Sequence, residues 1–505
     1  MPLFDTMETL FRQPENSKFL VQGKFGLEKE SLRVHDDGTI SLKDHPKSLG
    51  DKNINPYITT DYSESQMEFI TPPFESVEKS IHFLEQTHLW AYERLGKEFL
   101  WPMSMPCILP EEKEIPIAKY GNNAESQKKE IYRKGLSVRY GKKMQLICGI
   151  HYNFSLDDSI LEIISQEIYG EALSREKKDI LYFSLARNFL RYRWILVYLF
   201  GASPVVDDSY EPEVLKKLDQ LGGNCPYLGS PLYYKKYATS LRMSKFGYSN
   251  TEQEKFHYSY NTLPEYISDI EKGINTPIPK YSEIGMYTDK GEQIQLNENL
   301  LQLENEYYAP IRFKAEISGY SRQIDALSQK GIQHIEVRIL DIDPDSPIGI
   351  SQDEMHFTHL FLIMCLWEEN TPINENEQEC IEYNQRIVSL RGRHPNLTLH
   401  KKHTGDISLI SWSEEIFAKL DSIAQILDAE EKGNTGKYQK IVESQKKKLY
   451  NQKLLPSQKI IDSMCIKSKR GLIQLALRQA KKHKKYISEL SPDNALQKIL
   501  DSALT

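Results

Sequence analysis

Apolar and polar residues alternate along two short stretches of the first 70 residues, a pattern typical of half-buried strands. GLEKESLRV (26–34) places Glu28 and Glu30 on one face, and QMEFI (66–70) places Glu68 opposite its apolar neighbours. Successive side chains of a strand point to opposite faces, so each stretch predicts one face for a core and one polar face. Both polar faces carry carboxylates.

Two later stretches, GIHYNFS (149–155) and HIEVRIL (334–340), alternate in the same way. Their polar faces carry His151, Asn153 and Ser155 on the first stretch and His334, Glu336 and Arg338 on the second. Any one of the four stretches also fits an ordinary solvent-facing antiparallel sheet. Together they favour a functional surface, because they carry little of the Thr and Lys that is usual on exposed sheets.

Apolar residues recur every three or four positions elsewhere, which predicts helices. The clearest pattern covers 76–95, where Ser76 can cap the first turn. Further patterns cover the N-terminus, 126–140, 173–200, 355–368, 413–429 and most of 436–505. No repeat and no Pro/Gly/Ser-rich linker divides residues 20–430. We therefore expect an α+β catalytic unit over residues 1–432 and a basic helical C-terminal extension over residues 433–505, packed on that unit.

The charge of the chain is uneven. Residues 431–505 hold 17 Lys and Arg against 6 Asp and Glu, whereas the whole chain has a formal net charge of −7. Basic runs such as Lys446–Lys448 and KKHKK (481–485) are typical of a helix face that packs on acidic neighbours. Few aromatic residues lie between them, so we expect no nucleic-acid binding.

The composition is that of an ordinary globular protein, with 39% hydrophobic and 27% charged residues among 505. No segment approaches the roughly 18 consecutive apolar residues of a membrane span, and MPLFDTMETLFRQ at the N-terminus lacks the features of a secretory signal. The six cysteines form no CxxC pair and no metal-type spacing, which favours free thiols in a reducing compartment. We expect a cytoplasmic protein without a membrane partner.

The carboxylates of the strands predict a divalent metal site. Glu28 and Glu30 would lie about 6–7 Å apart on the same side of one strand. Three more carboxylates join them if the strands are neighbours: Asp61, Glu68 and Glu336. Converging carboxylates repel one another, a hard cation relieves the repulsion, and oxygen ligands favour Mg²⁺ or Mn²⁺. His151 would add one nitrogen ligand. Magnesium held by carboxylates usually serves substrate phosphates, which points to a nucleotide.

The common nucleotide motifs are missing from the sequence. GNTGK (433–437) has the wrong spacing for a P-loop, and no GxGxxG follows a strand. The sequence also lacks HExxH and a nucleophile elbow. These absences disfavour P-loop, Rossmann and protein-kinase folds, and they leave a sheet whose acidic face binds metal and nucleotide.

Eight motifs resemble those of the bacterial single-chain glutamate–cysteine ligases. They are GLEKESLRV, TTDYSESQMEFITP, WPMSMPC (101–107), YRKGLSVRYGKKMQLICGIHYNFS (132–155), FGASPVV (200–206), YATSLRMSKFGYSN (237–250), LQLENEYYAPIR (301–312) and HIEVRILDIDP (334–344). The resemblance covers residues 20–400, and WPMSMPC, GIHYNFS and IEVR together are highly specific. Little of the chain after Lys401 can be matched.

The resemblance implies a fold like the glutamine-synthetase catalytic domain, in which a curved antiparallel sheet forms a funnel surrounded by helices. It implies a two-step reaction with ATP and Mg²⁺. The γ-carboxylate of L-glutamate attacks the γ-phosphorus of ATP, and the amino group of L-cysteine then displaces phosphate from γ-glutamyl phosphate. The product, γ-glutamylcysteine, is the first intermediate of glutathione synthesis, and feedback inhibition by glutathione is a further implication.

The resemblance also assigns the site residues. The metal ligands would be Glu28, Glu30, Asp61, Glu68, His151 and Glu336. Arg338, Glu336 and Arg133 would be catalytic, with Arg338 on the glutamate or the transferred phosphoryl group and Arg133 on a metal-site carboxylate or a phosphate. Arg242 would hold the cysteine carboxylate. The remaining substrate pocket would comprise Tyr62, Tyr132, Leu136, Gln145, Ile147, Tyr248 and Tyr308, with Tyr62 standing where the family usually has Phe.

Three other functions compete with this interpretation. A γ-glutamyl ligase for a different amine would share the fold and metal site, and amine competition would distinguish it. A ligase-derived binding protein would act through the basic tail, but all six proposed metal ligands are present. A bifunctional enzyme that also adds glycine needs a second ATP-binding domain, and the roughly 75 residues after Gly433 are too few for one.

Overall fold

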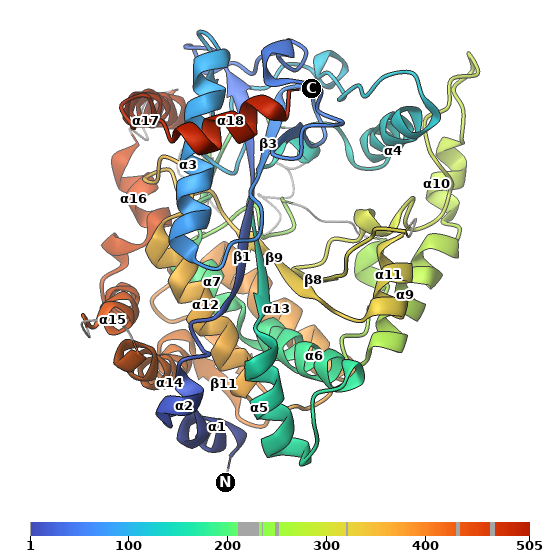
Figure 1. The fold of residues 1–505 in the computed structure, drawn as a ribbon. Coiled ribbons are helices and arrows are strands. Elements are labelled where there is room, and N and C mark those ends of the chain that lie inside the picture. Colours follow the sequence, from blue (N-terminus) through green and yellow to red (C-terminus); the bar gives the residue numbers. More distant parts are fainter. Residues whose placement is uncertain are drawn as a thin grey trace.

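The computed structural model describes residues 2–210, 232–234, 236–247, 252–319, 322–430, 435–464 and 470–504. An antiparallel sheet with the strand order β2-β3-β1-β5-β9-β8 runs through the middle of the molecule (Figure 1). Its strands are β1 (Gly23–Val34), β2 (Ile58–Thr60), β3 (Gln66–Ile70), β5 (Ile150–Leu156), β8 (Ile311–Lys314) and β9 (His334–Leu340), and the short β4 (Phe99–Leu100) pairs with the end of β1. The sheet is open rather than closed, with β2 and β8 at its edges.

The four strands predicted from alternation are confirmed, and they are consecutive neighbours in the sheet as β3, β1, β5 and β9. Their register places Glu28 opposite His151, Glu30 opposite Glu68, and Asn153 opposite Glu336. The alternating residues therefore meet across strand borders as well as along each strand. This register assembles the polar face that the sequence could describe only one strand at a time.

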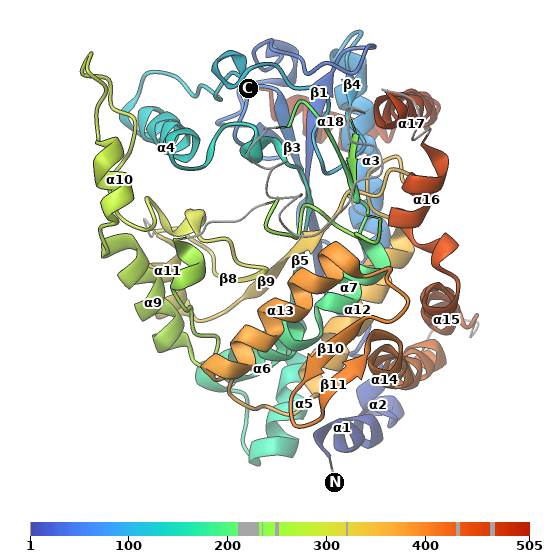
Figure 2. The same ribbon diagram turned by 180° about the vertical axis from the view of Figure 1, so that it is seen from behind.

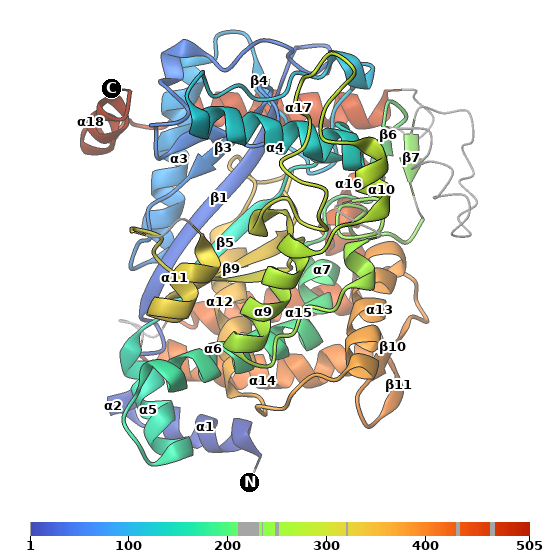
Figure 3. The ribbon, with the colours of Figure 1, turned by 90° about the vertical axis from the view of Figure 1, so that its right-hand side faces the viewer.

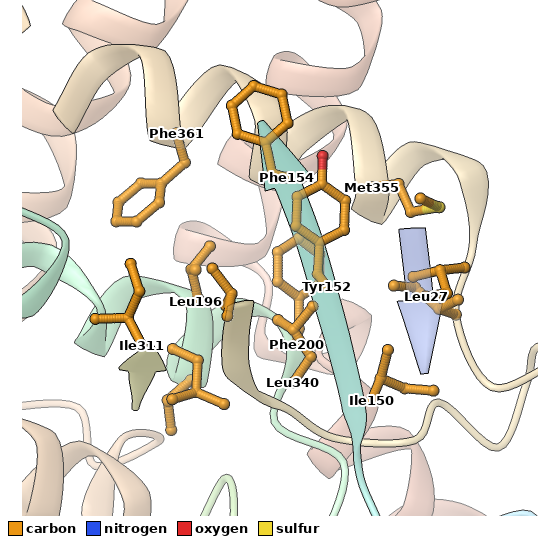
Figure 4. Close-up of a cluster of buried hydrophobic side chains, with 14 of the residues drawn as sticks. Leu27, Ile150, Tyr152, Phe154, Leu196, Phe200, Ile311, Leu340, Met355 and Phe361 are labelled. Carbon is orange, nitrogen blue, oxygen red and sulfur yellow. The ribbon is translucent and has the colours of Figure 1, made fainter. Parts of the chain in front are cut away.

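The apolar face of the sheet forms the centre of the hydrophobic core. Figure 4 shows Leu27 of β1 and Tyr152 and Phe154 of β5 among side chains of α12 (Gln352–Trp367) and α7 (Trp194–Phe200). Every residue of α12 from Glu354 to Trp367 is buried, as expected for a helix that is apolar around most of its circumference. The buried face of the sheet and this central helix hold the polar face in a fixed orientation.

The predicted helices are confirmed, with small shifts at their ends and with 173–200 divided into two helices. Ser76 caps α3 by accepting a hydrogen bond from the Lys79 N–H. Besides α7 and α12, the helices are α1 (Leu3–Phe11), α2 (Pro14–Ser17), α3 (Val77–Arg94), α4 (Ala124–Tyr140), α5 (Asp158–Tyr169), α6 (Arg175–Tyr192), α9 (Leu263–Asn275), α10 (Pro279–Ile284), α11 (Gln323–Lys330), α13 (Glu375–Arg391), α14 (Leu409–Glu430), α15 (Lys437–Tyr450), α16 (Pro456–Ser463), α17 (Gly471–Ser488) and α18 (Asn494–Ser502). Two two-stranded antiparallel sheets, β6 (Val205–Asp207) with β7 (Leu232–Tyr234) and β10 (Thr398–Lys401) with β11 (Gly405–Ser408), lie outside the main sheet. None of the described helices is long and apolar enough to cross a membrane.

Helices α4, α9 and α10 stand in front of the sheet in Figure 3. A buried ion pair joins α4 to the segment that follows α10, with 3.1 Å between Arg139 Nη1 and Glu306 Oε1 and no exposed side-chain surface on either residue. Tyr140 adds a 2.6 Å hydrogen bond to the same carboxylate. This network fixes residues 302–310 against α4 and so builds the wall opposite the sheet.

The C-terminal helices α14–α17 lie along one side of the molecule (Figure 2). Helix α15 packs on α12 and α14, and α17 and α18 pack on α3. Lys446 pairs with Asp421 at 2.9 Å, and Lys484 donates to the carbonyls of Gly96 and Glu98. The basic runs therefore contact the rest of the chain as expected, whereas the proposed boundary at residue 433 lies outside the described residues.

The described cysteines agree with the expectation of free thiols. Cys107, Cys148 and Cys365 are buried, Cys380 is half-buried, and none of these four is in a disulfide. Burial raises the pKa of the Cys365 thiol well above its ordinary value, which keeps it protonated and unreactive. The two remaining cysteines, Cys225 and Cys465, lie outside the described residues.

Candidate active site

Glu28, His151 and Glu336 converge on the polar face of the sheet from three adjacent strands. His151 Nδ1 lies 2.9 Å from Glu28 Oε2 and 3.3 Å from Glu336 Oε1. Within the described part of the chain these three form a group whose ligand atoms lie within 4.8 Å of one another, close enough to share one metal ion. The half-buried Glu28 faces a cavity, while His151 and Glu336 are buried behind it.

Glu336 is surrounded by cations. Its Oε1 lies 2.5 Å from Arg338 Nη1, and its Oε2 lies 3.0 Å from Lys314 Nζ. Burial favours the neutral acid, but Arg338, Lys314 and His151 outweigh it and lower the pKa of Glu336 well below its ordinary value. This carboxylate is therefore ionised at neutral pH and available as an oxygen ligand.

Arg338 reaches this group from β9. Asn153 pairs with Glu336 and Tyr152 with Val337, and the same register places Arg338 across from His151. Arg338 Nη1 accordingly lies 3.4 Å from His151 Nδ1 as well as beside Glu336. One extra residue of β9 follows before Ile150 pairs with Leu340, and bulges of this kind are common beside active sites.

His151 is held in its neutral form. Burial and the nearby Arg338 cation lower its pKa, although the hydrogen bond with Glu28 works in the opposite direction. A neutral imidazole has a free nitrogen lone pair and can bind a metal ion. Asn153, which the sequence prediction did not assign, donates a 2.9 Å hydrogen bond to Glu28 Oε1 and orients that carboxylate.

Glu30 and Glu68 form a second carboxylate group further along the face, close to Asp61. Burial and then the Asp61 carboxylate raise the pKa of Glu30 to about 8. Burial and the charges of Glu28, Asp61 and Glu30 raise the pKa of Glu68 well above its ordinary value. Carboxylates packed together without a cation in this way gain most from a bound divalent ion.

All six proposed metal ligands line one cavity of about 1050 Å³ between the sheet and the α4 wall. It also holds most of the other residues singled out in the sequence, namely Tyr62, Tyr132, Arg133, Leu136, Gln145, Arg242, Tyr308 and Arg338. Ile147 does not line it, because its side chain is fully buried in the core beside the cavity wall. Tyr248 lies outside the described residues.

Arg133 and Arg242, the two other arginines singled out in the sequence, also line the cavity. Arg133 Nε donates a 2.6 Å hydrogen bond to the backbone carbonyl of Asp61, and its guanidinium stacks 4.5 Å above the Tyr120 ring. Its hydrogen bonds go to the main-chain oxygens of Asp61 and Lys129, whereas the sequence prediction named a metal-site carboxylate or a phosphate as its partner. Arg242 Nη2 donates to the carbonyl of Arg338 at 2.9 Å, so the two arginines are adjacent.

Aromatic residues form the wall opposite the sheet. Gln145 Nε2 lies 3.4 Å from the Tyr308 hydroxyl, and Tyr132 and Leu136 line the same wall from α4. Tyr62 is buried at the edge of the cavity with 1% of its surface exposed. Around these residues the wall combines aromatic and aliphatic side chains with one amide, whereas Lys129, Arg133 and Glu304 of the same wall are charged.

Among the basic residues of the cavity that were not assigned from the sequence, Arg312 and Lys314 lie on β8 beside Glu336. Arg312 pairs with Glu336 in the register of β8 and β9, and Lys314 forms the ion pair with Glu336 described above. They alternate along IRFK, the same signal that identified the other strands, but this stretch of four residues is too short to stand out.

The comparisons with known proteins agree with this geometry. The family model described as glutamate-cysteine ligase matches residues 8–388. A glutamate–cysteine ligase of Clostridium acetobutylicum is 45% identical over 464 residues, covering 91% of this chain and 96% of that protein, and one of Pseudomonas putida is 39% identical over 490 residues, covering 96% and 90%.

Two solved structures share the fold. The glutamate–cysteine ligase of Francisella tularensis in complex with AMP has a TM-score of 0.86 and 32% identity, with 96% of this chain and 92% of that chain covered. A bifunctional glutathione synthetase of Pasteurella multocida has a TM-score of 0.73 and 25% identity, with 97% of this chain but 55% of that chain covered.

Proposed function

We propose roles for the residues of the cavity on the premise that the chain belongs to the glutamate–cysteine ligase family. The chain is an ATP-dependent ligase that joins the γ-carboxylate of glutamate to the amino group of cysteine and forms γ-glutamylcysteine, the first step of glutathione synthesis. The observation that supports our site assignment is the convergence of Glu28, His151 and Glu336 beside Arg338 in one cavity.

The residues of the polar face fit divalent cations. The group of Glu28, His151 and Glu336 offers two carboxylates and one neutral imidazole within reach of a single ion. The raised pKa values of Glu30 and Glu68 indicate a second position where carboxylate repulsion calls for a cation. Predominantly oxygen ligands favour Mg²⁺ or Mn²⁺. Bound Mg²⁺ would neutralise the phosphate oxygens of ATP and align them for transfer.

The first step joins two anions, so charge neutralisation matters more than covalent help from the protein. A γ-carboxylate oxygen of glutamate forms a bond to the γ-phosphorus of ATP, and the bond between that phosphorus and the β,γ-bridging oxygen breaks to release ADP. Arg338 lies within the carboxylate group and presents a planar fork to the cavity, which suits the oxygens of the transferring phosphoryl group. Glu336 fixes the direction of that fork.

The second step forms the amide. The uncharged amino group of cysteine attacks the γ-carbonyl carbon of γ-glutamyl phosphate, the carbon–oxygen bond to phosphate breaks, and the attacking nitrogen loses a proton. Arg242 would hold the cysteine carboxylate next to Arg338. Tyr132, Leu136, Gln145 and Tyr308 would enclose the thiol, because a small polarizable group suits aromatic and aliphatic walls with one amide.

The experiment that tests this proposal measures ADP release from purified protein with Mg-ATP and glutamate, with and without cysteine, followed by mass analysis of the product. Cysteine-dependent ADP release with γ-glutamylcysteine as the product is the expected result. A panel of other amino acids in place of cysteine tests the pocket assignment, and added glutathione tests feedback. Faster ADP release with a different amine would overturn the assignment of the thiol pocket while leaving the metal site in place.

A further inference from the structure

Contacts with other parts of the chain hold the Arg242 side chain in place at the cavity. Its Nη2 donates to the carbonyl of Arg338, and its Nη1 lies 3.6 Å from Asp341 Oδ1. The guanidinium also fills the space beside Gly149, where an added Cβ would lie 2.1 Å from Nη2. A side chain packed this closely is directed by its anchor, and Arg242 forms its ion pair with Asp341.

Asp341 is itself held by a turn after helix α7. Its Oδ2 accepts hydrogen bonds from the Ala202 N–H at 2.8 Å and from Ser203 Oγ at 2.7 Å. Ser203 also accepts a 2.7 Å backbone hydrogen bond from Leu241 N–H, directly before Arg242. The turn thus contacts both the anchor of the guanidinium and the backbone that carries it.

The start of this turn is fixed by a lysine from the C-terminal extension. Lys448 Nζ on α15 donates a 2.9 Å hydrogen bond to the carbonyl of Leu199 in the last turn of α7, and it lies 4.8 Å from the centre of the Phe200 ring. A cation at the C-terminal end of a helix satisfies free carbonyls and interacts favourably with the helix dipole.

Lys448 is half-buried and lies near two acidic side chains, Glu354 and Asp343. Burial lowers its pKa to about 8, and these two groups oppose that effect. Glu354 is 3% exposed, its Oε1 has no hydrogen-bond partner, and burial raises its pKa well above its ordinary value. A side chain without a donor at position 448 would leave the Leu199 carbonyl without this hydrogen bond and would remove the cation near Glu354 and Asp343, which is costly where water is scarce.

We propose that Lys448 is a positioning residue for Arg242: it anchors the end of α7, the following turn holds Asp341 through Ala202 and Ser203, and Asp341 directs the Arg242 guanidinium into the cavity. The inference rests on the proposed role of Arg242 as the anchor of the cysteine carboxylate. It gives the C-terminal extension a part in cysteine binding, although none of the described residues of that extension lines the cavity.

The test compares Lys448→Met with Lys447→Met in steady-state kinetics. Lys447 is the neighbouring residue on α15, and its recorded ion pair, with Glu443, is fully on the surface, so it is a matched control. Lys448→Met is expected to raise the KM for cysteine about fivefold to tenfold while the KM for ATP stays within twofold. Lys448→Arg, which keeps the cation, is expected to have a KM for cysteine close to that of the parent protein. Lys447→Met is expected to leave both constants unchanged.

A double variant separates this inference from the role of Arg242. If Lys448 acts through Arg242, Lys448→Met adds nothing to the loss in kcat/KM for cysteine already caused by Arg242→Ala. Additive losses, or equal increases in the KM for cysteine and for ATP in Lys448→Met, would overturn the inference even where Arg242→Ala alone behaves as proposed. Ser203→Ala, which removes one donor to Asp341, is expected to show the same selective increase, so the inference stays testable if Lys448→Met does not fold.

Discussion

Glu336→Gln tests the centre of the proposed site, because this one carboxylate contacts Arg338 at 2.5 Å, Lys314 at 3.0 Å and His151 at 3.3 Å. Glutamine keeps the shape but removes the charge, and its amide N–H₂ group must face either Arg338 or Lys314, both of which are donors. The variant therefore loses a proposed metal ligand and the fixed direction of Arg338 together.

The expected loss of activity is large and the expected loss of stability is small. Removing one preorganised electrostatic partner of a transition state typically lowers kcat by about 10²–10³-fold, or about 3–4 kcal/mol. Removing one member of a buried ion pair costs about 3–5 kcal/mol of stability when its partner stays dry. Arg338 and Lys314, however, have 23% and 24% of their side chains exposed to the cavity, so water can solvate them after the substitution. We therefore expect a destabilisation of about 1–2 kcal/mol.

The assay measures cysteine-dependent ADP formation over a range of Mg²⁺ concentrations, with urea unfolding on the same samples. Glu443→Gln on the surface of α15 is the control, because it also removes a carboxylate from an ion pair but lies far from the cavity lining. We expect the control to match the parent protein in both measurements. A Glu336→Gln protein that turns over within about threefold of the parent at the same Mg²⁺ requirement would refute the assignment of Glu336 as a metal ligand.

Three further predictions follow from other parts of the site. Arg242→Ala is expected to raise the KM for cysteine about 10–100-fold, the worth of a charge-assisted contact, with a much smaller change for ATP; equal changes in both would contradict its role. Since the pKa of Glu30 rises to about 8 on folding, the metal-free protein keeps a proton that the unfolded chain loses above pH of about 4.5. The stability of the metal-free protein therefore falls as the pH rises from about 4.5 to about 8. Because Mg²⁺ binds the ionised form of Glu30, it should raise the melting temperature more at pH 8 than at pH 6. An equal effect of Mg²⁺ at these two pH values would argue against Glu30 as a ligand. Arg139→Met leaves the fully buried Glu306 without its cation, so we expect a loss of about 3–5 kcal/mol in urea unfolding, and an unchanged midpoint would show that this pair does not hold the α4 wall.

Much of the polar face could be predicted from the sequence because strand alternation has a period of two and needs no knowledge of distant partners. Glu28, Glu336 and His151 were assigned to polar faces of separate strands, and the register of the sheet brings them together. A common antiparallel sheet was implied by the family resemblance rather than by the pattern, and the order of the strands comes from the structure. Without the resemblance, the four strands could have been placed in different sheets.

Features that depend on partners far away in the sequence were missed. The extra residue in β9 beside His151 is invisible in HIEVRIL, whose alternation looks regular, yet it shifts the pairing between Tyr152–Val337 and Ile150–Leu340. The main-chain partner of Arg133 was also missed, because a backbone carbonyl leaves no sequence signal. Side-chain chemistry was predictable where it follows from residue type, and orientation was not.

The alternation that identifies the site does not predict the contacts on the opposite face of the same strand, and Lys29 is an example. It stands between Glu28 and Glu30, so the strand period turns it away from the cavity and into the core, where only 3% of its surface is exposed. There its Nζ lies 2.8 Å from Nε2 of His88, whose other ring nitrogen donates to a backbone carbonyl of α3. Burial lowers the pKa of Lys29 to about 7. In the sequence alone, a lysine in a strand indicates a solvated face. In the structure, the core accommodates this lysine because it contacts a histidine that lies 59 residues away on a helix, and the strand pattern gives no information about that helix. Lys448 is a second example, on α15: in a run of three lysines that looks uniformly exposed, it is half-buried and donates a hydrogen bond to the carbonyl of Leu199. The chemistry of such residues is decided by the element that covers them, so it becomes visible only once the helices are in place around the sheet.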